Sequence, residues 1–343
     1  MSVRIPATIV TGFLGAGKTS LLRHLVRHAG GKRLAFVINE FGELGIDREL
    51  LLGCADCAPG DVVELANGCI CCAVADDFLP AIEKLLAADP RPDHIVVETS
   101  GLALPKPLIK AFAWPTIRTR VTVDGVIAMI DAGRLAAGDF AAERVRAGDH
   151  DNPLEEVFGD QLAAADLVVL NKTDLLNEVE YARLQAELRA KLRRGAKLLG
   201  AREGALPVAV ALGLGAAAED DLESRPSHAD ALGEHDHDDF ESFAINLSAL
   251  TRPDDFIGRL TEAIAAHEVL RAKGFAEVAG KPLRLAIQAV GARVDSYFDR
   301  PWHAGETRRG RLVVIGRKGL DRGAIAAALG AAGVAAAATR AAD

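Results

Sequence analysis

Short apolar runs rich in β-branched residues alternate with longer amphipathic segments through the first two thirds of the chain. A short apolar run predicts a buried strand, whereas apolar positions three or four residues apart predict a helix. The runs that predict strands are residues 5–11, 33–38, 94–99, 121–131, 166–170 and 206–211. The segments that predict helices are residues 18–29, 73–88 and 179–199. This alternation is typical of an α/β fold in which helices cover both faces of a mostly parallel sheet.

The composition changes after residue 215. Residues 216–240 are acidic, polar and almost free of strand-like runs, which predicts an exposed linker. Beyond it, strands are predicted at 241–248, 274–278, 283–290 and 311–315, and helices at 253–267 and 323–329. Two helices on a mostly antiparallel sheet form an α+β domain. We therefore expect an α/β domain over residues 1–215, the linker over 216–240 and an α+β domain over 241–343.

The overall composition argues against several classes of protein. Half of the 343 residues are hydrophobic, which is enough to build the cores of about two domains. A net charge of −8 and only 5% aromatic residues disfavour a nucleic-acid-binding protein. The apolar runs are shorter than the ~20 residues of a membrane-spanning helix, and no signal-peptide pattern is present. We expect a cytoplasmic protein that binds neither nucleic acid nor membrane; its oligomeric state stays open.

A glycine-rich motif follows the first predicted strand directly. Residues 12–19 (GFLGAGKT) fit G-x-x-x-x-G-K-[ST] between a strand and a helix, the context of a phosphate-binding loop. Glycines let backbone amides surround phosphates, and the helix N-terminus adds a positive dipole. We expect Lys18 to bind the β- and γ-phosphates and Thr19 to bind Mg²⁺. The alternative, a glycine turn with an exposed lysine, fits this context poorly. The residues expected to contact the nucleotide are Gly12, Gly15, Ala16, Gly17, Lys18, Thr19 and Ser20.

A second motif, NKTD at residues 171–174, follows the strand predicted at 166–170. In a P-loop protein this position binds guanine, because a carboxylate accepts hydrogen bonds from the guanine N1–H and exocyclic amine. Adenine offers no such pair of donors and would leave the Asp174 carboxylate unpaired. The alternative is a helix N-cap, which Thr or Asp often forms. We expect Asn171, Lys172 and Asp174 to bind the base.

The third predicted strand ends in ETSG, residues 98–101. In P-loop enzymes this position carries an acidic residue near Mg²⁺ or its water, and a glycine whose amide meets the γ-phosphate. Glu98 and Gly101 are the candidates, and Glu98 joins Lys18 and Thr19 as a candidate catalytic residue. The alternative is a strand end followed by a capped helix. No residue is an evident water-activating group, so we expect slow intrinsic hydrolysis.

All five cysteines fall in one short stretch of the sequence. An odd number so close together is a poor disulfide framework and indicates thiolates in a reducing compartment. Cys69, Cys71 and Cys72 form a C-x-C-C motif that suits tetrahedral Zn²⁺, Co²⁺ or Cu⁺. Three such close sulfurs rarely all bind one ion, so two thiolates plus another ligand is an alternative. Glu40 and Glu43 are candidate oxygen ligands.

Two further groups have open interpretations. Cys54 and Cys57 have the spacing of a metal-binding or redox pair, or are incidental loop thiols. His228, His235 and His237 lie in the acidic linker, where imidazoles and carboxylates bind metal loosely or are simply solvated.

Taken in order, GFLGAGKT, INEFGE, NGCICC, ETSG, VDGVIAMID and NKTD resemble the CobW family of metal-linked P-loop GTPases. The resemblance continues through KGFAEVAGKPLRLAIQAVGARVDSYFDRPW and RLVVIG near the C-terminus. It implies a metallochaperone in which Mg²⁺–GTP organises a metal site at Cys69, Cys71 and Cys72, and hydrolysis to GDP releases the metal. ETSGLALPKPL and DHDNPLEEVFGDQLAAADLVVLNKTD are similar to the cobalamin branch of the family. That branch implies Co²⁺ as cargo and cobaltochelatase as recipient in aerobic cobalamin biosynthesis.

Three alternatives stay open. The nearest is a zinc chaperone, because Zn²⁺ normally binds such a site more tightly than Co²⁺. A second is a regulatory GTPase in which C-x-C-C holds a structural zinc. The third, a thiol redox protein that uses Cys54 and Cys57, leaves the two nucleotide motifs unexplained.

Overall fold

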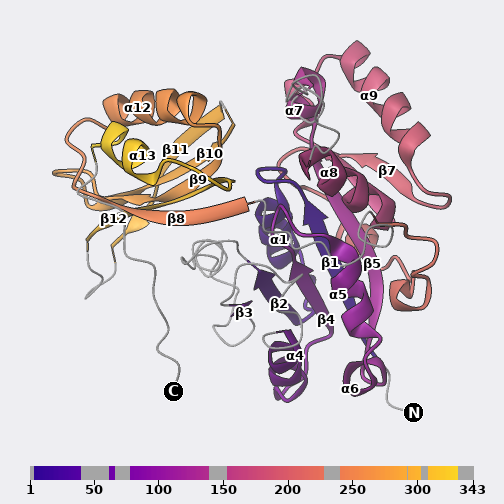
Figure 1. Cartoon of the computed structure of the whole chain (residues 1–343). Coiled ribbons are helices and arrows are strands. Elements are labelled where there is room, and N and C mark those ends of the chain that lie inside the picture. The colour runs from indigo at the N-terminus through magenta and orange to yellow at the C-terminus, as the bar shows by residue number, and fades with distance from the viewer. Residues whose placement is uncertain are drawn as a thin grey trace. The chain divides into compact units, whose positions relative to one another are not determined.

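The computed structural model describes residues 4–39, 62–65, 78–138, 153–227, 240–291, 293–302 and 308–330. The chain divides into two compact units (Figure 1). The described residues up to 227 form the first unit, and those from 240 onward form the second.

A seven-stranded sheet forms the centre of the first unit. Its strands lie in the order β3-β2-β4-β1-β5-β6-β7, and each neighbouring pair is parallel. The strands are β1 Ile5–Gly12, β2 Leu34–Asn39, β3 Val62–Leu65, β4 His94–Glu98, β5 Val121–Asp131, β6 Leu167–Asn171 and β7 Lys197–Gly200. The helices are α1 Lys18–Arg27, α4 Leu79–Leu86, α5 Pro105–Phe112, α6 Pro115–Arg118, α7 Ala132–Ala137, α8 Pro153–Ala164, α9 Glu178–Lys191 and α10 Val208–Ala211. The predicted α/β class is confirmed.

Alternate residues of the central strand β1 pack into two separate cores, because successive side chains of a strand point to opposite faces of the sheet. Ile9 packs into a core that includes Ile82 of α4 and Ile109 of α5. Val10 packs into the other core, which includes Leu21 of α1. Helices therefore cover both faces of the sheet, as Figure 1 shows.

The prediction is wrong at the sheet edge beyond β6. Residues 206–211, predicted as a strand, contain the short helix α10, whereas the edge strand β7 overlaps the end of the predicted helix 179–199. Helix α9 ends at Lys191, because Leu192 has extended backbone and Gly195 has a φ of +91°. Periodicity cannot distinguish a short buried strand from a short helix, which explains both errors.

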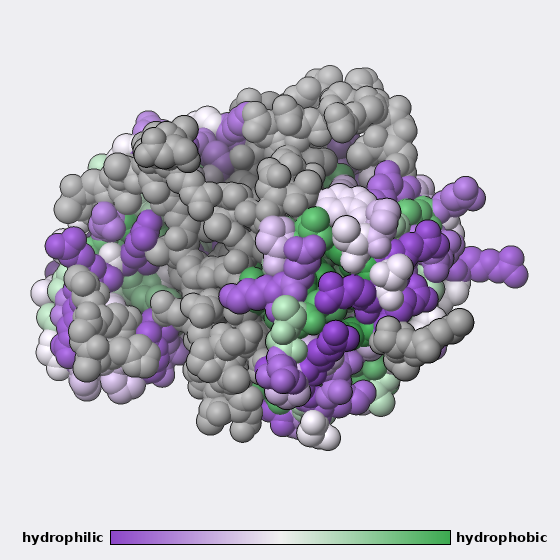
Figure 2. Space-filling model, turned by 90° about the horizontal axis from the view of Figure 1, so that it is seen from below, coloured by the Kyte–Doolittle hydropathy of each residue, from purple (hydrophilic) through white to green (hydrophobic). Residues whose placement is uncertain are grey.

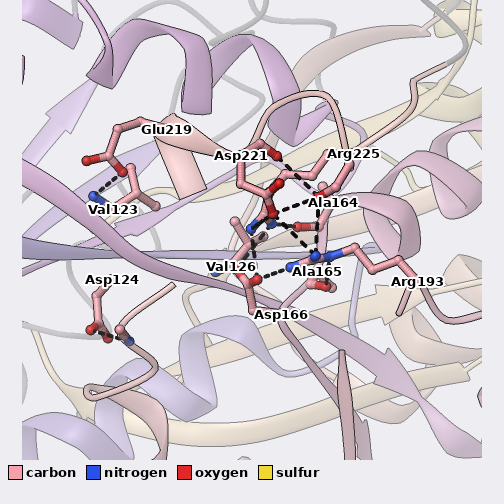
Figure 3. Close-up of polar contacts among 12 residues, drawn as sticks. Val123, Asp124, Val126, Ala164, Ala165, Asp166, Arg193, Glu219, Asp221 and Arg225 are labelled. Carbon is pink, nitrogen blue, oxygen red and sulfur yellow. Dashed lines mark hydrogen bonds and ion pairs between the residues drawn. The ribbon is translucent and has the colours of Figure 1, made fainter. Parts of the chain in front are cut away.

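Residues 216–227, here called the anchor segment, are not the exposed linker that their composition predicts (Figure 3). The Glu219 carboxylate accepts a hydrogen bond from the Val123 amide of β5 at 2.9 Å, and Glu219 is buried. Arg225 is fully buried and donates to both carboxylate oxygens of Asp166, at 2.8 and 3.1 Å. The segment is therefore part of the first unit. The rest of the predicted linker, 228–239, lies outside the described residues.

A five-stranded antiparallel sheet forms the second unit, with strand order β11-β10-β9-β12-β8. Its elements are β8 Phe240–Leu247, α12 Pro253–Ala266, β9 Val269–Ala276, β10 Leu283–Val290, β11 Arg293–Pro301, β12 Gly310–Arg317 and α13 Arg322–Ala328. Phe256 and Ile325 of the two helices share a core with Ile245 and Ile287 of the sheet. The predicted α+β architecture is confirmed. Strand β11 is additional, and its mostly exposed polar residues hide it from a search for apolar runs.

Among the described residues, none of the helices combines the length and the apolar character needed to cross a lipid bilayer. Figure 2 shows hydrophilic and apolar side chains interspersed on the described part of one face.

Candidate nucleotide-binding site

The glycine-rich motif forms the connection between the carboxyl end of β1 and the N-terminus of α1 (Figure 1). This is the context that the sequence predicts. Gly12 has a φ of +132°, and a Cβ there would lie 2.2 Å from the Met129 carbonyl oxygen of β5. Only glycine fits this close approach. Gly15 also has a positive φ, +77°, which favours glycine within the loop.

A third glycine of the loop, Gly17, makes room for a residue of the NKTD motif. Gly17 has a φ of +101°, and a Cβ there would lie 2.2 Å from Asn171 Nδ2. Asn171 Nδ2 donates to the Ala16 carbonyl oxygen at 2.9 Å, and its Oδ1 accepts from the Gly204 amide at 2.9 Å. The Asn171 side chain is buried. It therefore joins the end of β6 to the glycine-rich loop.

The Lys18 ammonium lies within the loop. Its Nζ donates to the Gly12 carbonyl oxygen at 2.7 Å and to the Phe13 carbonyl oxygen at 3.3 Å, and Lys18 is only 6% exposed. These contacts place a positive charge among the backbone amides that would surround a phosphate. Ser20, in the first turn of α1, is exposed.

Two side-chain oxygen atoms that could bind a cation lie together, one at the start of α1 and one at the end of β4. Thr19 Oγ1 donates to Glu98 Oε1 at 3.1 Å, and Glu98 is a buried residue at the end of β4. They meet because β1, which leads into the loop, pairs in parallel with β4. Hydroxyl and carboxylate oxygens are the ligands that Mg²⁺ prefers. The pair therefore fits a Mg²⁺ ion beside the phosphates that Lys18 would bind.

The loop after β4 packs directly against the glycine-rich loop. A Cβ on Gly101 would lie 2.7 Å from the Leu14 backbone nitrogen, so only glycine allows this contact. On α8, Gln161 Nε2 lies 3.2 Å from the Gly101 carbonyl oxygen and 3.4 Å from that of Ala103. Gly101 therefore lies directly against the glycine-rich loop. Gln161 lies in the stretch DHDNPLEEVFGDQLAAADLVVLNKTD, but its sequence context predicts no role for it at this site.

The remaining NKTD residues are held at the carboxyl end of β6. Lys172 has a left-handed backbone, with φ +61°, and its ammonium forms an ion pair with the buried Asp131 carboxylate. The Thr173 amide and hydroxyl both donate to the Ala201 carbonyl oxygen at 3.1 Å. Asp174, in contrast, is exposed. Its carboxylate is accessible to the hydrogen-bond donors of a base.

Arg134 of α7 is a further residue at this site that the sequence does not indicate. Its guanidinium donates to the Leu14 carbonyl oxygen at 3.4 Å and lies 5.3 Å from the centre of the Phe13 ring. Its amide donates to the Asp131 side chain at 3.2 Å, which caps α7. Arg134 adds positive charge beside the glycine-rich loop. The sequence does not reveal this contact, because Arg134 and Leu14 lie 120 positions apart.

The ligands predicted for the cargo metal lie outside the described residues. These are Glu40, Glu43, Cys69, Cys71 and Cys72, and the same holds for Cys54, Cys57, His228, His235 and His237. Within the described part of the chain, no group of three or more His, Cys, Asp or Glu side chains is placed to hold a metal ion. Strand β2 ends at Asn39, immediately before Glu40, and β3 ends at Leu65, four positions before Cys69.

A parallel sheet whose first strand leads through this loop into a helix defines a P-loop nucleotide-binding protein. The chain belongs to the CobW/HypB/UreG family: residues 6–199 match the CobW/HypB/UreG nucleotide-binding domain. Residues 240–333 match the cobalamin synthesis protein cobW C-terminal domain. The resemblance drawn from the motifs is confirmed, and the chain is a GTPase.

Two relatives match nearly the whole chain. The zinc chaperone CobW of Sinorhizobium sp is 51% identical over 341 residues, covering 95% of this chain and 96% of the relative. The zinc chaperone CobW of Pseudomonas aeruginosa is 49% identical over 345 residues, covering 94% and 90%. The crystal structure of Zn(II)-bound YjiA GTPase from E. coli is 25% identical, covers 96% of this chain and 99% of its own, and has a TM-score of 0.43.

Proposed function

We propose that this chain is a metal chaperone whose affinity for its metal ion is controlled by GTP. One observation carries the proposal: strands β3, β2, β4 and β1 are parallel neighbours, so their carboxyl ends share one edge of the sheet. There Thr19 contacts Glu98. In the sequence, the candidate ligand Glu40 directly follows β2, and the C-x-C-C motif begins four positions after β3. Nucleotide and metal would therefore be bound by neighbouring loops.

Each described site residue has a role in this proposal. The glycine-rich loop and Lys18 bind the phosphates, the Gly101 amide meets the γ-phosphate, and Asp174 binds guanine. Thr19 and Glu98 would hold Mg²⁺, which supplies positive charge to neutralise the phosphates. The thiolates of C-x-C-C require a reducing environment such as the cytoplasm, where we place the protein.

The coupling between nucleotide and metal has a thermodynamic consequence. If GTP raises the affinity for metal, the metal raises the affinity for GTP by the same factor. Hydrolysis removes the γ-phosphate that the Gly101 loop would contact. Without the γ-phosphate contact, the loops that bind nucleotide and metal are no longer held in the arrangement that favours metal binding. The metal is then released to a recipient protein.

The proposed cargo is Zn²⁺. Relatives that are 51% and 49% identical to this chain are named zinc chaperones, and Zn²⁺ outcompetes Co²⁺ at most thiolate sites. Co²⁺ delivered to cobaltochelatase in cobalamin biosynthesis is the second candidate, favoured by the similarity of ETSGLALPKPL to the cobalamin branch. The zinc and cobalt functions differ in the recipient protein, because only delivery of Co²⁺ requires an acceptor that takes cobalt.

A metal titration tests the coupling. Co²⁺ serves as a spectroscopic probe, because its thiolate charge-transfer band reports binding, and the titration is run with Mg²⁺–GTP analogue, with Mg²⁺–GDP and without nucleotide. We expect the tightest binding with the GTP analogue and loss of the band in Cys71→Ser. Cys57→Ser is the control and should keep the coupling. Equal affinities in all three nucleotide states would overturn the proposal.

A competition experiment tests the cargo. Zn²⁺ is added to the Co²⁺-loaded protein in the Mg²⁺–GTP-analogue state, with cobaltochelatase present or absent as acceptor. A zinc chaperone should exchange Co²⁺ for Zn²⁺ and leave the chelatase unloaded. Retention of Co²⁺ with the analogue, and transfer of Co²⁺ to the chelatase when GTP replaces the analogue and is hydrolysed, would instead establish the cobalt function.

A further inference from the structure

A buried amide on α8 holds the loop after β4. Gln161 is 2% exposed, and its Nε2 donates to the carbonyl oxygens of Gly101 at 3.2 Å and Ala103 at 3.4 Å. A primary amide nitrogen carries two N–H donors, so one atom can serve both carbonyl groups. Because both acceptors are carbonyl oxygens, only the nitrogen end of the Gln161 side chain can face them.

The loop that Gln161 holds touches the glycine-rich loop. Gly101 lies so close to Leu14 that a Cβ would be 2.7 Å from the Leu14 nitrogen. Within the loop, the Ala103 amide donates to the Ser100 carbonyl oxygen at 3.2 Å, which closes a tight turn. The turn is therefore held by two contacts: Gln161 binds its carbonyl groups, and Leu14 of the glycine-rich loop packs against Gly101.

We infer that Gln161 is a positioning residue of the GTPase that makes the protein discriminate GTP from GDP. It holds the turn at Gly101 against the glycine-rich loop, where the Gly101 amide would meet the γ-phosphate. GDP has no γ-phosphate, so its binding depends on the glycine-rich loop and Asp174 but not on this turn. The inference rests on the nucleotide site proposed above. It assigns a role to Gln161, which lies outside the nucleotide motifs GFLGAGKT, ETSG and NKTD.

The chemistry explains why glutamine suits this position. Without the amide, two buried carbonyl groups lose their partners, and a buried polar group without a partner destabilises the conformation that contains it. The turn would then shift toward other arrangements. GTP binding would have to restore the original arrangement, which lowers its affinity.

The test replaces Gln161 by methionine, which keeps the length of the side chain and removes both donors. Leu162→Met, on the same helix, is the matched control. Fluorescent GDP and a non-hydrolysable fluorescent GTP analogue are titrated with Mg²⁺ into the full chain. For Gln161→Met we expect about a tenfold rise in Kd for the GTP analogue and less than about a twofold change for GDP. Equal weakening of both nucleotides, or no change in either, would overturn the inference.

Gln161→Glu supplies a second test with an almost unchanged shape. A carboxylate facing two carbonyl oxygens is repelled, whereas a protonated carboxyl group donates one hydrogen bond. Its burial should raise its pKa, so the affinity for the GTP analogue, relative to wild type, should recover as the pH falls from about 8 to about 6. If the affinity of Gln161→Glu for the GTP analogue, divided by that of wild type, stays constant over this pH range, the inference is contradicted. If wild-type protein itself fails to prefer the GTP analogue at any metal concentration, the proposed function fails instead.

Discussion

The side-chain amide of Asn171 occupies the space that a Cβ on Gly17 would require. The distance from that Cβ to Asn171 Nδ2 would be 2.2 Å, and the same nitrogen donates to the Ala16 carbonyl oxygen at 2.9 Å. The glycine-rich motif and the NKTD motif therefore pack directly against each other. A change in either motif should disturb the other.

Gly17→Ala is expected to abolish most nucleotide binding. The backbone at φ +101° is strained for alanine, and the new methyl group displaces Asn171. We expect a loss of stability of about 1–3 kcal/mol and a severe loss of affinity for both GTP and GDP. Gly195→Ala is the control: its φ is +91°, but no atom lies within 4 Å of the added Cβ. It should lower stability without affecting nucleotide affinity. Chemical denaturation and nucleotide titration measure the two effects, and equal loss of affinity in both variants would contradict this explanation.

Asp174→Asn should change the base that the protein prefers. The exposed Asp174 carboxylate is expected to accept hydrogen bonds from the N1–H and the exocyclic amine of guanine. Xanthine has a carbonyl group in place of that amine, and an asparagine side chain can donate a hydrogen bond to it. We expect roughly a hundredfold weaker GTP binding together with stronger binding of xanthosine triphosphate. Competition titrations of the two nucleotides against wild type and variant measure this exchange. If xanthosine triphosphate gains nothing, Asp174 does not bind the base.

The anchor segment should contribute strongly to the stability of the first unit. Arg225 is fully buried and contacts Asp166, so Arg225→Met leaves that carboxylate with less compensating charge (Figure 3). We expect a loss of about 3 kcal/mol in the free energy of unfolding.

Arg118→Met is the matched control for Arg225→Met, because Arg118 forms an exposed ion pair with Asp220 of the same segment. Its removal should cost less than about 1 kcal/mol. Urea denaturation compares the two variants. Equal losses would show that the anchor segment is not held by its buried contacts.

A buried histidine should make stability depend on pH. His94 is 2% exposed, and its Nε2 lies 2.8 Å from Thr8 Oγ1. Burial lowers the pKa of His94 from 6.5 to about 4, although the Asp124 carboxylate opposes the shift. Between these values the unfolded chain binds a proton that the folded chain does not. The contribution of neutral His94 is therefore complete above about pH 6.5 and is lost as the pH falls toward 4.

His94→Gln removes this titrating group. The variant should have lower stability at neutral pH, because glutamine packs less well there, but a smaller decrease in stability between pH 7 and about pH 4.5. Denaturation at several pH values measures the slope. A slope identical to that of wild type would assign the pH dependence to other groups.

Local sequence is sufficient to predict most of the first unit. The apolar runs of β1 and β5 and the glycine-rich motif each carry their signal within about a dozen consecutive residues, so the local pattern alone places the loop between β1 and α1. The edge of the sheet is predicted wrongly, because LPVAVA and the end of the segment 179–199 are too short for periodicity to identify their structure. Composition also misjudges residues 216–227, since acidity alone does not reveal that Glu219 and Arg225 have buried partners.

The sequence by itself determined the fold class, the nucleotide motifs and the family, because these depend on patterns between residues close along the chain. Only the tertiary structure decided which side chains hold the motifs together. Gln161 reaches Gly101 across 60 positions, Asn171 reaches Ala16 across 155, and Arg225 reaches Asp166 across 59. A hydrogen bond between distant residues leaves no periodic trace in the sequence, because its formation depends on where the sheet places the two ends.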